Sequence, residues 1–161
     1  MRANCSRRAE GGFTTIELVA VMVVMGVLAV VALPRLDSAN LMRGDAWRDQ
    51  VQAALRHAQA TAISHRRLVC ASVATDAVTL TIATANPATA CAGALTGPDG
   101  HANYARDTRA IATAVAPTGA LFFQPDGRIT TDGAGTTVTD RTITISGQTS
   151  ISVSAETGLV R

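Results

Sequence analysis

Residues 13–33 read FTTIELVAVMVVMGVLAVVAL, and no charged or strongly polar side chain occurs between Leu18 and Leu33. As an α-helix that rises about 1.5 Å per residue, this stretch would span roughly 30 Å, the thickness of the hydrocarbon core of a bilayer. A helix on the surface of a soluble protein would carry a polar stripe, and this segment has none. The stretch therefore predicts a membrane helix, because the alternative, a fully buried core helix, needs a larger protein around it.

The residues before this segment predict its orientation. Arg2, Arg7 and Arg8 precede it, and positively charged flanks remain in the cytoplasm, so the rest of the chain is expected outside. A secretory signal peptide also has a basic start. However, its apolar region is usually 7–15 residues long and ends at a small-x-small cleavage pattern, and neither property fits here. Gly11 and Gly12, the small residues, stand before the apolar run instead.

Composition limits what the rest of the 161-residue chain can be. Hydrophobic residues make up 47% and charged residues 16%, which argues against disorder. Aromatic residues are only 3%, so a base-stacking surface is not expected. The net charge is +2, but without Arg2, Arg7, Arg8 and Glu10 the remaining acidic and basic side chains balance. Bulk charge therefore gives no case for nucleic-acid binding.

Glu17 is the only acid within the apolar run. A carboxylate costs about 2.5–3.5 kcal/mol at the centre of a bilayer and less near its edge. Two interpretations stay open. Glu17 is either an acid tolerated at the interface, or a residue that awaits a cationic partner inside the membrane.

The segment after the apolar run is amphipathic. Large and small apolar residues recur on one helical face up to about His65: Trp47, Val51, Leu55, Ala58 and Ala62. Gly44 and Asp45 are the expected place for an interruption, with Asp45 as an N-cap. His57 and His65 are eight residues apart, which is not the spacing of a helical zinc pair, and we expect no metal site.

The apolar period then changes from helical to alternating. Residues 78–83, 142–145 and 151–153 predict half-buried antiparallel strands, and residues 68–73 and 120–123 are further candidates. Residues 83–116 have weak periodicity and are interpreted as loops with at most a short element. A long helix followed by strands predicts an α+β fold in which the helix packs on one face of an antiparallel sheet.

The cysteines fit an exported domain. Cys5 lies before the apolar run, which leaves Cys70 and Cys91 as a pair. In an oxidising compartment they would form a disulfide that closes a loop of about 20 residues, worth roughly 3 kcal/mol. The alternative is two buried free thiols, and the spacing fits neither a metal nor a redox motif.

The start of the chain resembles a known family. Residues 12–18, GFTTIEL, followed by the apolar run and Ala32-Leu33-Pro34-Arg35, resemble the class III leader of the type IV pilin superfamily. The resemblance implies that a prepilin peptidase cuts between Gly12 and Phe13 and methylates Phe13. It also implies that Glu17 pairs with the N-terminal amine of Phe13 on a neighbouring subunit. Thr15 stands where the family commonly has Leu.

Later segments resemble the minor pilins and pseudopilins of that superfamily. Residues 55–63 with 68–70, and the turn 123–128, are similar to the group that includes type II secretion pseudopilin H; residues 32–35 and 156–160 are closer to minor pilins of the mannose-sensitive haemagglutinin (MSHA) system. The resemblance implies a pilin-like fold with four parts. These are a cleaved leader (1–12), a membrane and filament-core helix (13–34), its amphipathic continuation (35–67) and a β-rich periplasmic domain (68–161).

The expected function is that of a non-catalytic subunit. The chain would cross the inner membrane once, with its N-terminus in the cytoplasm, and then join an MSHA-like type IV pilus or a type II secretion pseudopilus. We expect no enzymatic activity, because the chain has no nucleophile-elbow pattern and no paired carboxylates, and we expect no cofactor. The alternative is a DNA-binding minor pilin. In that case Arg128, Arg141 and Arg161 would contact nucleic acid, although the second Arg of the family's Gly-Arg-x-Arg pattern is missing after Gly127-Arg128.

Overall fold

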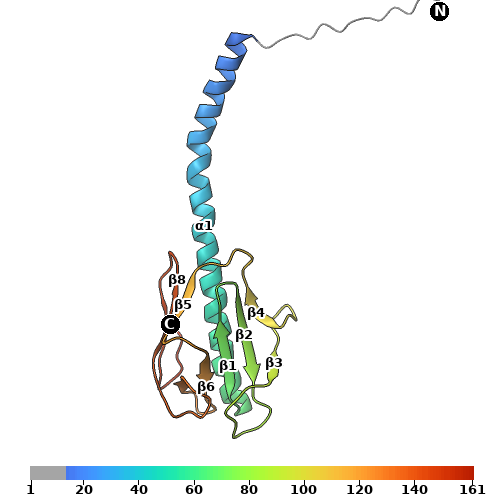
Figure 1. Ribbon diagram of the computed structural model, residues 1–161, viewed down its shortest axis with the longest axis vertical. Coiled ribbons are helices and arrows are strands. Elements are labelled where there is room, and N and C mark those ends of the chain that lie inside the picture. Colours follow the sequence, from blue (N-terminus) through green and yellow to red (C-terminus); the bar gives the residue numbers. More distant parts are fainter. Residues whose placement is uncertain (1–13) are drawn as a thin grey trace, which may run out of the picture. The chain divides into compact units, whose positions relative to one another are not determined.

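The computed structural model describes residues 14–161, with the side-chain surroundings of residues 31–41 left out of the description. The chain divides into two compact units, Met1–Asn40 and Leu41–Arg161. One helix, α1 (Thr15–His65), runs through residues of both units (Figure 1). The predicted cleavage and methylation positions, Gly12 and Phe13, lie outside the described residues.

In the first unit, α1 carries apolar side chains that nothing in the described chain covers. Every residue from Thr14 to Val30 is exposed, and the large apolar side chains from Ile16 to Val30 are between 48% and 75% exposed. The helix begins with the N–H of Glu17 donating to the hydroxyl of Thr14 at 3.4 Å, a side-chain cap that satisfies an otherwise free donor. Within the described residues, no helix has an apolar stretch long enough to cross a membrane.

In the second unit, the predicted helical stripe is confirmed. The five stripe residues are all fully buried: Trp47, Val51, Leu55, Ala58 and Ala62. The helix ends as predicted at His65, where Arg66 takes a φ of 52°. The predicted break at Gly44 and Asp45 is wrong, because α1 is continuous there. Gly44 instead allows close packing, since a Cβ at this position would lie 2.5 Å from Nε2 of Gln148.

The strands of the second unit form two antiparallel sheets rather than one. The larger sheet has the order β3-β2-β1-β6-β7, with β4 also paired to β2. Its strands are β1 (Val69–Val73), β2 (Ala77–Ile82), β3 (Gly93–Leu95), β4 (Asn103–Arg106), β6 (Leu121–Phe123) and β7 (Ile129–Thr130). The smaller sheet has the order β5-β8-β9, formed by β5 (Thr113–Ala116), β8 (Arg141–Ile145) and β9 (Ile151–Val153).

The three strands predicted from alternating residues are confirmed as β2, β8 and β9, and the two further candidates as β1 and β6. The interpretation of residues 83–116 as loops was wrong, because β3, β4 and β5 lie there. Side chains from α1 and from both sheets meet in one core, so the fold is α+β with the helix against antiparallel sheet, as expected. Figure 1 shows both sets of strands beside the part of α1 that follows residue 41.

The end of the chain is fixed to α1 by side chains that donate to backbone carbonyls. Nε of Arg48 donates to the carbonyl of Thr149 at 2.8 Å. Nε2 of Gln59 donates to the carbonyl of Thr157 at 2.6 Å, and Arg56 donates to that of Val160 at 3.3 Å. Val160 itself is buried and bridges to Val153 of β9, so the last residues complete the core.

The disulfide predicted between Cys70 and Cys91 is confirmed. It joins β1 to the loop before β3, with an S–S distance of 1.98 Å and a sequence separation of 21. The side chain of Asn86, in the same loop, donates to the carbonyl of Arg66 at 2.8 Å. The bridge and this hydrogen bond together hold the loop between β2 and β3 close to the end of α1.

Candidate functional site

The apolar segment of α1 is the first candidate site. We call the exposed side chains of Ile16 to Val30 the apolar rod. Contiguous exposed apolar surface of this length is unusual in a soluble monomer and indicates a surface that another apolar environment covers. Glu17 is the one acid in this segment, and it is exposed on the first turn of the helix. Its pairing with a neighbouring subunit stays a prediction.

The second candidate, a patch formed by Arg128, Arg141 and Arg161, does not exist as predicted. Arg141 is only 1% exposed, because it shares the inward face of β8 with Ile143 and Ile145. Its Nη2 donates to the carbonyls of Gly119 and Ala120 at 2.7 and 3.1 Å. The burial of this guanidinium lowers its pKa, and it cannot reach a phosphate at the surface.

The other two arginines lie apart from Arg141 in the hydrogen-bond network, Arg128 with a side-chain partner and Arg161 with a backbone partner. Arg128 forms an ion pair with Asp126 at 2.7 Å, across the turn between β6 and β7. Burial opposes the ionisation of Asp126, but the backbone N–H and guanidinium of Arg128 outweigh it and lower the pKa of the carboxyl. The backbone of Arg161 pairs with that of Ser152. The structure therefore gives no convergent basic surface from these three residues.

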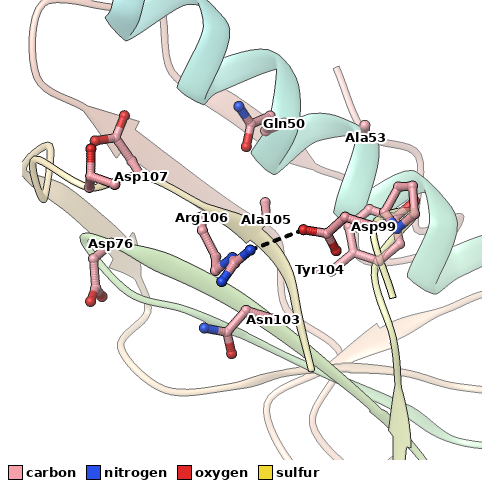
Figure 2. Close-up of a pocket in the computed structure, with 11 residues that line it drawn as sticks. Gln50, Ala53, Asp76, Asp99, Asn103, Tyr104, Ala105, Arg106 and Asp107 are labelled. Carbon is pink, nitrogen blue, oxygen red and sulfur yellow. Dashed lines mark hydrogen bonds and ion pairs between the residues drawn. The ribbon is translucent and has the colours of Figure 1, made fainter. Parts of the chain in front are cut away.

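The third candidate is a groove that the sequence did not reveal. It has a volume of about 710 Å³, within the range of ligand-binding clefts, and lies between α1 and the edge strand β4. Gln50 and Ala53 line it from α1, and Tyr104, Ala105 and Arg106 line it from β4. Figure 2 shows Arg106 near the middle of the groove, with Asp76 and Asp107 to one side of it and Asp99 to the other.

Charge is unevenly distributed along this groove. Arg106 forms an ion pair with Asp99 at 3.2 Å, and the backbone N–H of His101 donates to the same carboxylate at 3.1 Å. These contacts, led by the His101 N–H, lower the pKa of Asp99. Asp76 and Asp107 form no ion pair with any residue that the structure describes, although the backbone N–H of Asp107 donates to the carbonyl of Asp76 at 2.8 Å. The carboxylate of Asp107 accepts the backbone N–H of Arg109 at 2.6 Å. This end of the groove therefore carries two negative charges without an ion-pair partner among the described residues.

His57 takes a structural position. The ring of His57 stacks on that of Tyr104, with ring centroids 4.9 Å apart. Among the side chains that the structure describes, no cluster of three or more His, Cys, Asp or Glu could hold a metal ion. The sequence signal nearest the groove was Gly97-Pro98-Asp99-Gly100, which predicts a turn but does not indicate that α1 and β4 enclose a hollow beside it.

Two crystal structures of the Pseudomonas aeruginosa type IV minor pilin FimU are similar to this chain. In one, the identity is 19% and the TM-score 0.49, over 73% of this chain and 90% of that one. In the other, the identity is 20% and the TM-score 0.46, over 78% and 89% of the two chains. No protein-family model and no curated protein matches this chain. The term type IV minor pilin describes the protein in those two crystal structures.

Proposed function

We propose that this chain is a minor pilin or pseudopilin, a non-catalytic subunit held in the inner membrane by residues 13–34 before it joins a filament. The observation that carries this proposal is the apolar rod, whose side chains are exposed along a continuous helix. Leaving this surface in water would cost about 25 cal/mol for each Å² of apolar area. A lipid bilayer covers the rod first, and helices of neighbouring subunits cover it after assembly.

The division of labour along α1 supports a subunit of this kind. From residue 47 onward, the stripe of α1 is fully buried in the core of its own globular unit. Before residue 31, the described side chains have no such core. One helix therefore contributes to its own domain through one segment and is available to other molecules through another.

In this proposal, cleavage of the leader and pairing of Glu17 convert a subunit held in the membrane into one that assembles. Cleavage between Gly12 and Phe13 would remove the basic leader and leave the rod attached to the mature chain. The new amine of Phe13 would carry a positive charge, and Glu17 of a neighbouring subunit would neutralise it. In a helix bundle of low dielectric, an unpaired carboxylate is costly, so this pair would select one register between subunits.

The disulfide supports a periplasmic location for the globular unit. Disulfides persist in oxidising compartments such as the bacterial periplasm and are rare in the cytosol. With the Arg-rich leader in the cytoplasm and the Cys70–Cys91 bridge outside, the chain would cross the inner membrane once. The filament is an MSHA-like type IV pilus or a type II secretion pseudopilus. DNA uptake is not favoured, because Arg141 is buried.

The test follows the mass and location of the protein in cells with an intact assembly machine. Gly12→Ala is expected to leave an uncut membrane-bound precursor, whereas Gly11→Ala, its matched control, is processed. Glu17→Gln is expected to be cut and inserted but to enter sheared filaments far less than the native chain. Normal processing of Gly12→Ala would overturn the leader assignment, and equal incorporation of Glu17→Gln would overturn the pairing role.

A further inference from the structure

We propose that the groove between α1 and β4 binds an extended, lysine- or arginine-containing peptide segment of a partner protein by adding it as a strand to β4. This inference is independent of the membrane role proposed above. It rests on three features of the same place: the hollow, the edge of a sheet, and the uncompensated carboxylates.

The edge of the sheet supplies the first argument. β4 pairs with β2 through Ala77↔Arg106, Val78↔Ala105 and Thr79↔Asn103, and no other described strand pairs with β4. An edge strand presents backbone N–H and C=O groups that can pair with another chain. Peptides bind such edges by main-chain hydrogen bonds, with side chains that enter alternate pockets.

The available length of edge is defined by the neighbouring turn. Gly97 approaches the first half of β4 so closely that a Cβ there would lie 2.9 Å from the carbonyl oxygen of Tyr104. Residues 105–106 lie beyond this close approach, and the groove continues from them to Asp107. The N–H of Asp107 points to the β2 side, where it donates to the carbonyl of Asp76, so the backbone of Ala105 faces β2 as well and that of Arg106 faces outward. We therefore expect the added strand to pair with the backbone of Arg106.

The charges select the chemistry of the peptide. Arg106 is already neutralised by Asp99, at 3.2 Å. Asp76 and Asp107 have no cationic partner among the residues that the structure describes, and the backbone bond between them holds them at the same end of the groove (Figure 2). Lysine or arginine side chains of the added strand would lie against these carboxylates, which point away from each other in Figure 2. A peptide with acidic side chains would be repelled from the same position.

The remaining surface suits a peptide rather than a small cation. Gln50 and Asn103 offer amide donors and acceptors along the hollow, and the ring of Tyr104, held by its stack on His57, provides a flat wall. A compact cation would use only the acidic end. A strand uses the full length of the groove, from Tyr104 to Asp107.

The experiment is an NMR titration of the full isotope-labelled chain in zwitterionic micelles. The probe is the peptide VKTKVKT, in which lysines share one face of a strand. Two comparison peptides are VETEVET and VKTKVKT with alternate backbone nitrogens methylated. We expect VKTKVKT to shift the amide signals of Ala105 and Arg106, and neither comparison peptide to do so. No shift with millimolar VKTKVKT, or equal shifts with VETEVET, would overturn the proposal.

Two variants separate the parts of the inference. Asp76→Asn with Asp107→Asn is expected to weaken binding by roughly 2- to 30-fold, the effect of losing two exposed ion pairs. Asp45→Asn with Glu156→Gln removes the same charge outside the groove and should leave affinity unchanged. Trp47 fluorescence verifies that each variant is folded. Equal weakening by both pairs would show that only net charge attracts the peptide, and unchanged binding of the methylated peptide would exclude strand addition.

Discussion

Replacement of Arg141 by methionine tests whether its buried guanidinium is a stabilising element. The side chain is 1% exposed on the inward face of β8. Its Nη2 has two carbonyl acceptors, those of Gly119 and Ala120, while Nε and Nη1 are buried with no hydrogen-bond partner among the described residues. Methionine keeps a long, flexible apolar chain in the same space without the charge.

The expected change in the free energy of unfolding depends on two opposing contributions, the hydrogen bonds of the guanidinium and the cost of its desolvation. Each hydrogen bond from the charged Nη2 contributes about 1.5–3 kcal/mol. The desolvation of an unpaired buried ion costs several kcal/mol, and apolar replacements of buried charges are often neutral or stabilising by about 1–4 kcal/mol. Gly119 is exposed, so its carbonyl can be hydrated after the substitution. We therefore expect Arg141→Met to leave the free energy of unfolding unchanged or to raise it.

A cavity variant supplies the contrast. Arg141→Ala also removes the charge but leaves the space of the long side chain empty. Truncation of a buried long side chain to alanine costs about 2–5 kcal/mol, so the alanine variant should be less stable than the methionine variant by about that amount. Arg109→Met changes an exposed arginine and should shift stability by less than about 0.5 kcal/mol.

Trp47 makes the measurement direct. It is the only tryptophan in the chain and is fully buried in the core, so its fluorescence reports opening of the globular unit. Urea titrations in non-ionic micelles, which cover the apolar rod, give the free energy of unfolding of each variant. A loss of more than about 1 kcal/mol in Arg141→Met would refute the reasoning, because the guanidinium would then be a net contributor to stability.

Three further predictions use the same fluorescence assay. Cys70→Ser with Cys91→Ser opens a bridge of sequence separation 21 and should lower the free energy of unfolding by about 3 kcal/mol; a loss below 1 kcal/mol would contradict the loop-entropy account. Gly158→Ala should destabilise far more than Gly147→Ala. Both glycines have positive φ, at 63° and 75°, but only at Gly158 would a Cβ meet a neighbouring backbone carbonyl; equal losses would show that φ alone matters. Asp132 has its pKa lowered from 3.8 to about 2, chiefly by the backbone N–H of the turn that follows, so its stabilising effect is present above pH 3.8 and lost as the pH falls through about 2. Between pH 3.8 and about 2, the free energy of unfolding of Asp132→Asn should therefore fall less than that of the native chain. An equal fall in the two proteins would contradict this prediction.

Regular apolar patterns in the sequence predict the main elements of the fold. The stripe from Trp47 to Ala62 repeats over several helical turns, and Ile or Val alternates with Thr or Ser in 142–145 and 151–153, so the residues themselves indicate the buried faces. By contrast, β3, β4 and β5 each contain a single large apolar or aromatic residue among Ala, Gly and polar residues. They are strands because β2 and β8 pair with them, and local preference does not contain that information.

Arg141 was misplaced for a different reason. A charged residue is usually exposed, and that average led to its assignment to a surface patch. The alternation of β8 contained the contrary signal, because Arg141 has the same parity as Ile143 and Ile145. The groove could not be predicted at all, since α1 and β4 are far apart in sequence and only tertiary packing brings Gln50 beside Tyr104 and Arg106.

The attachment of the last dozen residues to α1 has a consequence for biosynthesis. Arg48 and Arg56 donate to carbonyls more than a hundred positions later in the chain. During translation these acceptors are made long after α1, so a product terminated before residue 149 would leave Arg48 and Arg56 without them. Such a fragment would present an incompletely packed α1 and would be a target for chaperones and proteases.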